Sequence, residues 1–274
     1  MEKLDRLGWV AGLTFTTFGV RIGVRVTSTE LLDLASSVFP AGSKVSASRT
    51  VERLYSVVGG STRGGDSGRR FFLLYGNVAR LTRTLNSQEL YEIWQSDMDF
   101  YIAQRAPRKL FVHAGVVAWK GHAIVIPGRS HSGKTTLVKA FLQAGATYYS
   151  DEFAVFDERG RVHPFPRPLS VRTLNTTRKI TPEELGSLPG TGPIPTGLIM
   201  LTHYDAGVRW RPRQTSSGRA ILGLLANTLA ARRQPEGALA TLEQVASGAQ
   251  VLQGTRGEAR ETVESIVYHW GKKV

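Results

Sequence analysis

The segment IPGRSHSGKTTL, residues 126–137, contains the pattern that decides the fold. Gly128, Gly133, Lys134 and Thr135 follow the spacing G-x-x-x-x-G-K-[ST]. Glycines let successive backbone N–H groups point toward phosphate oxygens, and a helix that follows adds the positive end of its dipole. In this pattern the lysine reaches the β- and γ-phosphates of a nucleotide, and the hydroxyl binds Mg²⁺. The segment therefore predicts a phosphate-binding loop.

The flanking residues separate such a loop from an ordinary glycine-rich turn. The apolar run HAIVIP, residues 122–127, predicts a strand that leads directly into the loop. Leu137, Val138, Phe141 and Leu142 form the apolar stripe of a helix after it, and Gly145 ends that helix. Strand, loop and helix thus occur in the order that phosphate binding requires.

Two carboxylates follow at the end of the next predicted strand. ATYYS, residues 146–150, leads to Asp151 and Glu152. Adjacent residues at a strand end point in different directions, so one carboxylate can face a metal and the other a substrate. The run FVHAGVVAW, residues 111–119, predicts the strand before the loop and contains His113. On its own, a histidine in an apolar strand is more often a hydrogen-bonded core residue than a catalyst.

The rest of the chain predicts two domains, an α+β domain over residues 1–108 and a catalytic α/β domain over 109–274. In the first, the pattern predicts strands in Leu13–Val26 and Phe71–Leu85, a short helix with a Thr27–Glu30 capping box, a loop at 59–68 and a helix from Ser87 to Pro107. In the second, it predicts a hairpin around 158–161, an extended connector at 163–172, a surface loop up to 197, a strand at 198–204 and helices at 217–233, 236–247 and 257–270.

Composition limits the classes of function. The 274 residues carry 35 Lys and Arg against 22 Asp and Glu, a net charge of +13, which is typical either of a protein with an anionic partner or of diffuse surface charge that keeps a protein soluble. The basic residues are scattered, so we do not expect a nucleic-acid-binding arm. The absence of cysteine excludes disulfides and thiolate metal sites. With no apolar run of membrane-spanning length and no secretory signal pattern at the N-terminus, the sequence predicts a cytoplasmic protein without a membrane span.

The stretch FVHAGVVAWKGHAIVIPGRSHSGKTTL, followed by YYSDE, resembles the catalytic domain of the HPr kinase/phosphorylase family and its HPr-kinase-like relatives. That family is similar in its P-loop core to phosphoenolpyruvate carboxykinases. The resemblance covers residues 109–205 and implies an α/β, P-loop, HPr-kinase-like catalytic domain beside a smaller N-terminal α+β domain. It implies an ATP-dependent phosphotransferase that uses Mg²⁺ and phosphorylates a serine.

The resemblance also implies roles for individual residues. His113, Lys134, Asp151 and Glu152 would be catalytic, with Glu152 the proton acceptor and His113 a support for the carboxylates or phosphates; Asp151 stays a candidate for the same role. Thr135 and Asp151 would hold the metal. The residues that would cradle the nucleotide are Gly128, Arg129, Ser130, His131, Ser132, Gly133, Lys134, Thr135 and Thr136. Arg167 and Arg172 are candidates for a clamp on phosphate or on an acidic acceptor, since the guanidinium fork fits phosphate oxygens.

One departure from the family leaves alternatives open. The family has a Glu-x-Arg-Gly run after the acidic pair, where this chain has LSVRT, residues 169–173. The departure favours the HPr-kinase-like branch and leaves phosphorylase activity and a second metal contact open. We expect a protein or peptide acceptor with a serine hydroxyl, for which an acidic surface suits the charge. A small-molecule kinase, a nucleotide-binding regulatory module without kinase activity, and a homo-oligomer remain alternatives, and the first domain would serve substrate recognition or assembly.

Overall fold

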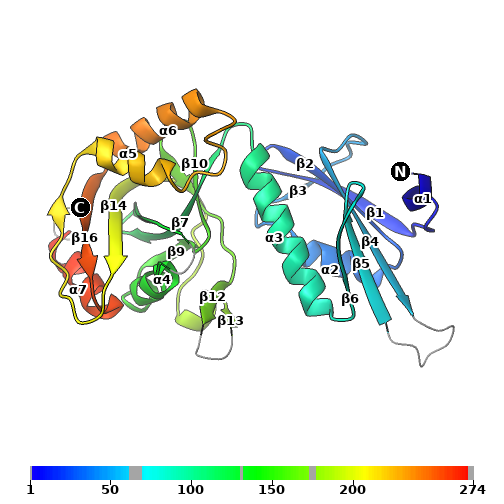
Figure 1. Ribbon diagram of the computed structural model, residues 1–274, viewed down its shortest axis with the longest axis horizontal. Helices are drawn as coiled ribbons and strands as arrows, with labels where there is room; N and C mark the ends of the chain where they lie inside the picture. Colours follow the sequence, from blue (N-terminus) through cyan, green and yellow to red (C-terminus); the bar gives the residue numbers. More distant parts are fainter. Residues whose placement is uncertain (1, 62–69, 130–131, 173–176, 271–274) are drawn as a thin grey trace. The chain divides into compact units, whose positions relative to one another are not determined.

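The computed structural model describes residues 2–61, 70–129, 132–172 and 177–270 (Figure 1). The chain forms two compact units, Met1–Pro107 and Arg108–Val274. Each combines helices with sheets, so the protein is mixed α/β. None of the helices in the described ranges has the length and apolar composition needed to cross a membrane.

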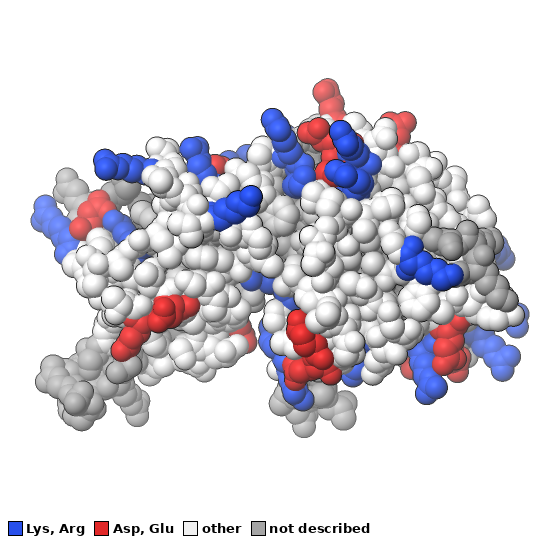
Figure 2. All heavy atoms as spheres, turned by 180° about the vertical axis from the view of Figure 1, so that it is seen from behind, with Lys and Arg blue, Asp and Glu red and all other residues white. Residues whose placement is uncertain are grey.

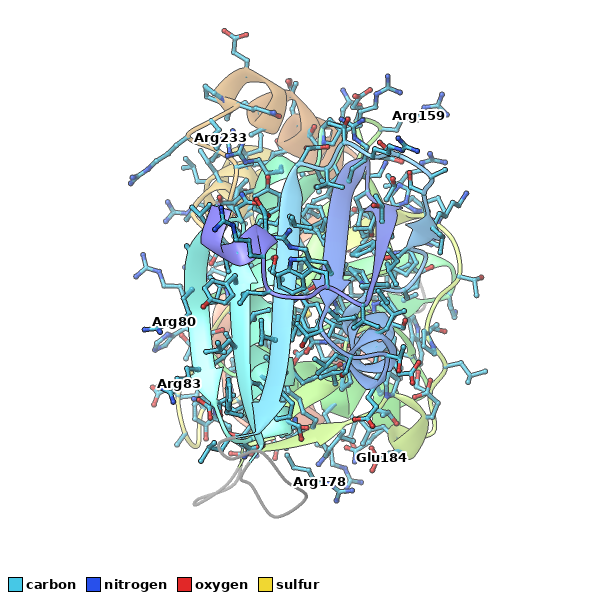
Figure 3. The ribbon with its side chains drawn as sticks, turned by 90° about the vertical axis from the view of Figure 1, so that its right-hand side faces the viewer. Arg80, Arg83, Arg159, Arg178, Glu184 and Arg233 are labelled. Carbon is cyan, nitrogen blue, oxygen red and sulfur yellow. The ribbon has the colours of Figure 1, made fainter. Side chains whose placement is uncertain are left out.

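The first unit is built on a six-stranded sheet with strand order β3-β1-β2-β4-β5-β6. Its elements are α1 (Glu2–Asp5), β1 (Ala11–Thr17), β2 (Val20–Val26), α2 (Glu30–Val38), β3 (Lys44–Val45), β4 (Arg53–Ser61), β5 (Arg70–Gly76), β6 (Ala79–Thr84) and α3 (Ser87–Arg105). Trp94 and Met98 of α3 are fully buried, as are Tyr55 and Leu74 of the sheet. On the edge strand β6, Arg80 and Arg83 point outward (Figure 3), where charged side chains oppose pairing with another strand.

Most of the elements predicted for this unit are confirmed. Leu13–Val26 forms the β1–β2 hairpin, Phe71–Leu85 forms β5 and β6, and the long helix begins at Ser87. The capping box at Thr27 is wrong, because the N-cap of α2 is Thr29. The hydroxyl of Thr27 instead accepts a hydrogen bond from the Gly59 N–H at 3.0 Å, a contact across the sheet that local spacing cannot reveal. Of the predicted glycine-rich loop, residues 59–61 belong to β4 and 62–69 lie outside the described residues.

The second unit contains an eight-stranded sheet, a two-stranded hairpin and four α-helices in its described part. The elements are β7 (Leu110–Trp119), β8 (His122–Pro127), α4 (Lys134–Gln143), β9 (Thr147–Ser150), β10 (Phe153–Phe156), β11 (Arg161–His163), β12 (Leu169–Arg172), β13 (Thr177–Ile180), η1 (Glu183–Leu185), β14 (Ile194–Tyr204), β15 (Arg213–Gln214), α5 (Ser217–Leu225), α6 (Pro235–Ser247), β16 (Gln250–Arg256) and α7 (Ala259–His269).

The large sheet has the order β11-β10-β7-β8-β14-β16-β15, and β9 also pairs with β7. β7 and β8 form an antiparallel hairpin, whereas β8, β14 and β16 are parallel to one another. Because these three strands run in the same direction, their carboxyl ends meet at one edge of the sheet. The glycine loop leaves β8 at that edge, where open α/β sheets bind their ligands.

Apolar side chains cover both faces of this sheet. α5 and α6 pack on one face through Ala220, Leu224 and Leu242, and α4 and α7 pack on the other through Phe141 and Ile266 (Figure 1). The core of the unit is thus two-sided, and it holds the edge with the glycine loop in place.

On the surface drawn in Figure 2, Lys and Arg side chains form separate groups, and some of them lie beside Asp or Glu.

The elements around the loop are confirmed, and the errors lie further along the chain. The strands expected at 111–119, 122–127, 146–150 and 198–204 are present. The helix expected at 217–233 ends at Leu225, and residues 250–256 form the strand β16, which the sequence did not reveal. β16 has only two adjacent apolar residues, Val251 and Leu252, and is a strand because it pairs with β14. Within the expected connector, Leu169–Arg172 is a strand that pairs with β13.

Candidate active site

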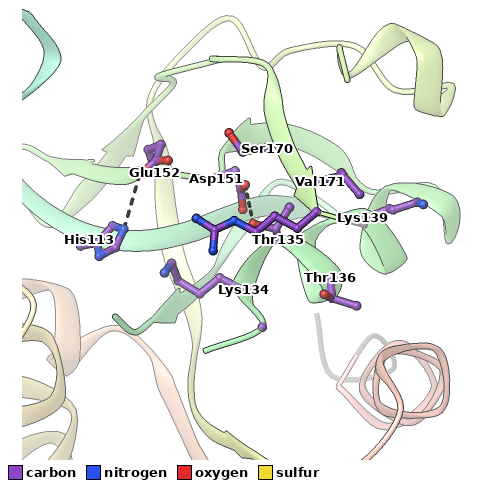
Figure 4. Close-up of a pocket in the computed structure, with 11 residues that line it drawn as sticks. His113, Lys134, Thr135, Thr136, Lys139, Asp151, Glu152, Ser170 and Val171 are labelled. Carbon is purple, nitrogen blue, oxygen red and sulfur yellow. Dashed lines mark hydrogen bonds and ion pairs between the residues drawn. The ribbon is translucent and has the colours of Figure 1, made fainter. Parts of the chain in front are cut away.

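A cavity of about 450 Å³ opens beside the glycine loop (Figure 4). The end of the loop and the first turns of α4 form one wall, and His113 of β7 lies next to them. Asp151 and Glu152, between β9 and β10, form a second wall, and β12 forms a third. Residues up to 59 positions apart in the chain, His113 and Arg172, therefore meet in one place. The sequence predicted this for the loop, the acids, His113 and Arg172, but not for the other residues of β12.

Gly133 makes the turn from the loop into α4. It is the N-cap of the helix and has φ +80°, a conformation that side chains with a Cβ rarely adopt. A Cβ at this position would also collide with a terminal nitrogen of Arg256. The N-cap has no side chain to accept hydrogen bonds from the first turn, so the N-terminus of α4 is suited to an anion.

Lys134 is the first residue of α4 and only 7% exposed. Its ammonium group donates a hydrogen bond to the carbonyl oxygen of Arg129, at 2.8 Å. Burial lowers the pKa of this lysine, and the nearby charges of Asp151 and Glu152 oppose that shift. The lysine therefore lies within the loop, next to the space where a phosphate would lie.

Thr135 and Asp151 form the buried side of the cavity. The hydroxyl of Thr135 donates to Oδ2 of Asp151 at 2.7 Å. Oδ1 of the same carboxylate is buried and has no hydrogen-bond partner among the described residues. Burial raises the pKa of Asp151 to about 7; the charge of Glu152 adds to the shift, while the Thr135 hydrogen bond opposes it. A buried carboxylate oxygen without a donor is a group that a cation would stabilise.

His113 and Glu152 form the open side. Nε2 of His113 lies 3.4 Å from Oε2 of Glu152, whose side chain is 49% exposed. Burial acts to raise the pKa of Glu152, but the hydrogen bond and charge of His113, together with Lys134 and Lys179, outweigh it, so that pKa is below its usual value. The neighbouring acids are thus shifted in opposite directions, the arrangement found where two carboxylates serve different roles.

An Mg²⁺ ion and a nucleoside triphosphate fit these residues. Mg²⁺ in phosphate-transfer sites takes one or two protein oxygens and completes its shell with water and phosphate. The Thr135 hydroxyl and the unpartnered Asp151 oxygen provide such a pair of oxygens. In the described part of the chain, no group of three or more His, Asp or Glu could form a closed metal cage. The donor set therefore suits a metal that shares its shell with phosphates.

The remaining predicted residues are placed as follows. Thr136 lines the cavity together with Gly133, Lys134 and Thr135. The N–H of Gly128 donates to the carbonyl of His113 at 3.2 Å, and the N–H of Ser132 donates to that of Arg129 at 3.2 Å. Ser130 and His131 lie outside the described residues.

Of the two candidates for the phosphate clamp, Arg172 lines the cavity and Arg167 does not. Arg172, in β12, lines the cavity. Arg167 is not among the described residues that line it: its side chain is buried with the guanidinium 5.6 Å from the centre of the Phe165 ring. Its backbone carbonyl accepts a hydrogen bond from the Tyr148 hydroxyl at 2.6 Å. Only Arg172 is therefore placed where it could reach a ligand in this cavity.

Sequence reasoning missed Arg256, at the end of β16. Its side chain is buried, and Nη2 donates to the carbonyl of Gly133 at 3.1 Å. The ring of Tyr204 lies 5.2 Å from its guanidinium carbon. Arg256 therefore fixes the turn of the glycine loop from 123 residues away. The signal was absent because β16 itself was not predicted.

Sequence reasoning also missed three polar residues in or beside the cavity. Lys139 of α4 and Ser170 of β12 line the cavity. Lys179 of β13 donates to the Ser170 hydroxyl at 2.7 Å. The spacing of Lys139 from Lys134, five residues along one helix, does not put the two on one face, and the other two residues depend on an unpredicted hairpin.

Comparison with known proteins adds little to this geometry. No protein-family model and no curated protein sequence matches the chain. Among solved structures, the Hpr(Ser) kinase/phosphatase from Coxiella burnetii is similar, with 14% sequence identity and a TM-score of 0.35 over 60% of this chain and 97% of that chain. At that level the match assigns neither a family nor an activity.

Proposed function

We propose that the protein is an ATP-dependent, Mg²⁺-requiring kinase that transfers the γ-phosphate to a serine hydroxyl of a protein or peptide. The observation that carries the proposal is the hydrogen bond between Thr135 and Asp151, at 2.7 Å. The other carboxylate oxygen of Asp151 is buried and has no hydrogen-bond partner among the described residues. This pair lies in the same cavity as the loop lysine. A hydroxyl, a carboxylate and a lysine at a helix N-terminus are the parts that phosphoryl transfer requires.

The loop and α4 would bind the triphosphate. In the proposed complex, Lys134 exchanges its hydrogen bond with the Arg129 carbonyl for one with the β- and γ-phosphates. First-turn N–H groups of α4 donate to phosphate oxygens, and Arg256 keeps Gly133 in the conformation that this requires. Mg²⁺ would neutralise charge on the phosphates, while Thr135 and Asp151 would supply its protein ligands. Catalysis would then come mainly from positioning and charge neutralisation.

Glu152 would act as the general base. Its exposed carboxylate takes the proton of the acceptor serine as the serine oxygen bonds to the γ-phosphorus; the bond between that phosphorus and the β,γ-bridging oxygen breaks, and ADP leaves. His113 holds the base through the 3.4 Å contact and keeps it ionised. Asp151 is the less suitable base, because its buried carboxylate is already joined to Thr135.

The charge of the protein supports an acidic acceptor. Lys139 and Arg172 line the cavity, and the chain as a whole has a net charge of +13. Positive charge at a site raises the rate at which anionic partners associate with it. We propose that residues 1–107 serve recognition of this acceptor or assembly into a homo-oligomer, and that the protein acts in the cytoplasm.

The test is transfer from γ-labelled ATP with Mg²⁺ into a library of serine peptides, together with nucleotide-binding titrations. We expect label in acidic peptides with the wild type, none with Lys134→Ala, and wild-type transfer with Lys44→Ala, a matched change on the exposed strand β3. Nucleotide binding without transfer to any peptide or small molecule would instead identify a regulatory module. Transfer only to a small molecule would identify a small-molecule kinase, and no binding would refute the proposal.

A further inference from the structure

Ser170 is held at the cavity by the register of the β12–β13 hairpin. It lies directly opposite Lys179 in this antiparallel pair, so the two side chains project from the same face. Nζ of Lys179 donates to Oγ of Ser170 at 2.7 Å. Leu169 and Val171, the neighbours of Ser170 in β12, pack against the apolar cluster beneath α4. Because successive side chains of a strand point to opposite faces, Ser170 points to the other face of the hairpin.

The strand that carries Ser170 is anchored on both sides. Leu169 is fully buried, and the carbonyl of Arg167 accepts the hydrogen bond from the buried Tyr148. On β13, the residue before Lys179, Arg178, forms an ion pair with Glu184 at 2.8 Å (Figure 3). The hydroxyl is therefore presented by an extended segment of fixed position, as an extended peptide substrate would present one.

The surroundings of this hydroxyl match those that an acceptor needs. Ser170 lies beside Asp151 and Glu152 (Figure 4), and it lines the same cavity as Lys134 and Thr135. Because Lys179 donates to the serine oxygen, the hydrogen of the hydroxyl remains for donation to another group. The nearby carboxylate with solvent access is Glu152.

We propose that Ser170 is a phosphoryl acceptor within the chain, so that the protein phosphorylates its own β12–β13 hairpin in cis. This inference rests on the proposed kinase function. Glu152 takes the hydroxyl proton of Ser170, the serine oxygen bonds to the γ-phosphorus of ATP, and the bond from that phosphorus to the bridging oxygen breaks, releasing ADP. No oxidant, reductant or further reactant is needed.

The product would have a charge partner already in place. A phosphoserine carries a charge of about −1.5 to −2 and three strong acceptor oxygens. Lys179, now 2.7 Å from the serine oxygen, becomes the donor of a charge-assisted hydrogen bond to the phosphate. The hairpin thus contains both the acceptor and the cation that would stabilise the modified form.

The experiment incubates the full chain with ATP and Mg²⁺, measures intact mass, and maps the modified peptide. We expect one added phosphate, about 80 Da, on Ser170. Ser170→Ala should abolish this addition, Ser170→Thr should restore it as phosphothreonine, and Ser247→Ala, a matched change at the end of α6, should leave it unchanged. Lys179→Met should slow it about tenfold, the effect of losing a hydrogen bond from a charged donor.

Dilution separates transfer in cis from transfer between molecules. For transfer in cis, we expect a first-order rate constant that stays the same over about a hundredfold range of protein concentration. A rate constant proportional to concentration would overturn the cis geometry. Phosphate transfer to serine peptides without phosphate on Ser170 would overturn this inference and leave the kinase function intact, whereas absence of both peptide transfer and nucleotide binding would refute the kinase function itself.

Discussion

The two sides of the cavity differ in how far their carboxylates are removed from water. On one side, Asp151 is 6% exposed and accepts a hydrogen bond from the Thr135 hydroxyl. On the other side, the side chain of Glu152 is 49% exposed and faces His113. The two residues are adjacent, yet the pKa of the first is raised and that of the second is lowered. The comparison teaches that one step along a strand end is enough to give two carboxylates opposite environments.

Each environment suits one role better than the other. The buried side lacks a donor for one carboxylate oxygen within the described residues, and a cation would fill that need. The open side keeps its carboxylate ionised and accessible, as a base for an incoming hydroxyl must be. The following changes should break the difference between the two sides or make it sharper.

The largest effect is expected on the open side. Glu152→Gln removes the base and should lower the rate of phosphate transfer about a thousandfold, within the range for general-base catalysis. ATP binding should be unchanged, because the loop is intact. Steady-state transfer and a nucleotide-binding titration measure the two quantities. Glu158→Gln, the same change at an exposed residue of the next turn, is the control; equal activity of both variants would remove Glu152 from the mechanism.

On the buried side, we expect the carboxyl group of Asp151 to make the free energy of unfolding of the metal-free protein depend on pH. The pKa of Asp151 is about 7 in the folded state against 3.8 for an aspartate exposed to water, so between these pH values the folded state binds more protons than the unfolded state. Stability should therefore fall as pH rises from about 4 to 7, by roughly 2–4 kcal/mol at about 1.4 kcal/mol per pKa unit.

Denaturant unfolding of Asp151→Asn at several pH values measures this contribution. The variant should lose that part of the pH dependence and be more stable than the wild type at pH 8 in the absence of Mg²⁺. Identical pH profiles for the two proteins would mean that Asp151 is not held in a desolvated state.

The same substitution should affect transfer less than the change at Glu152. Asp151→Asn keeps the hydrogen bond of Thr135 but removes the charge, so we expect about a hundredfold slower transfer, as for loss of one preorganised electrostatic group. The Mg²⁺ concentration for half-maximal activity should rise, while metal-free ATP binding persists. A Mg²⁺ titration that gives the wild-type midpoint would contradict the metal role.

The smallest effect is expected at His113. His113→Ala should slow transfer about tenfold, the effect of losing one hydrogen bond to a charged group. Because His113 contributes most to lowering the pKa of Glu152, that pKa should rise in the variant, and the acid limb of the pH profile should move to higher pH. A tenfold loss with an unchanged profile would assign His113 a merely structural part.

The sequence predicted the parts of the site that depend on local spacing. The glycine loop, the strands on either side of it and the adjacency of Asp151 and Glu152 follow from patterns within about 40 residues. The opposite environments of the two acids did not follow, because burial depends on what packs over each side chain.

What escaped prediction depends on contacts between distant segments. Arg256 reaches Gly133 only because β16 pairs with β14, and β16 carries no alternating pattern of its own. Ser170 and Lys179 meet only through the register of a hairpin whose first strand follows three prolines. The hydroxyl of Thr27 bonds to Gly59 instead of capping a helix for the same reason, a partner supplied by a neighbouring strand.

The most direct test of the central claim is a structure of the protein with Mg²⁺ and a non-hydrolysable ATP analogue. We predict that Lys134 leaves the Arg129 carbonyl for the γ-phosphate, that the metal lies against Thr135 and Asp151, and that Glu152 faces the γ-phosphorus across the space for a hydroxyl. A triphosphate bound elsewhere, with Lys134 still on the carbonyl, would contradict it.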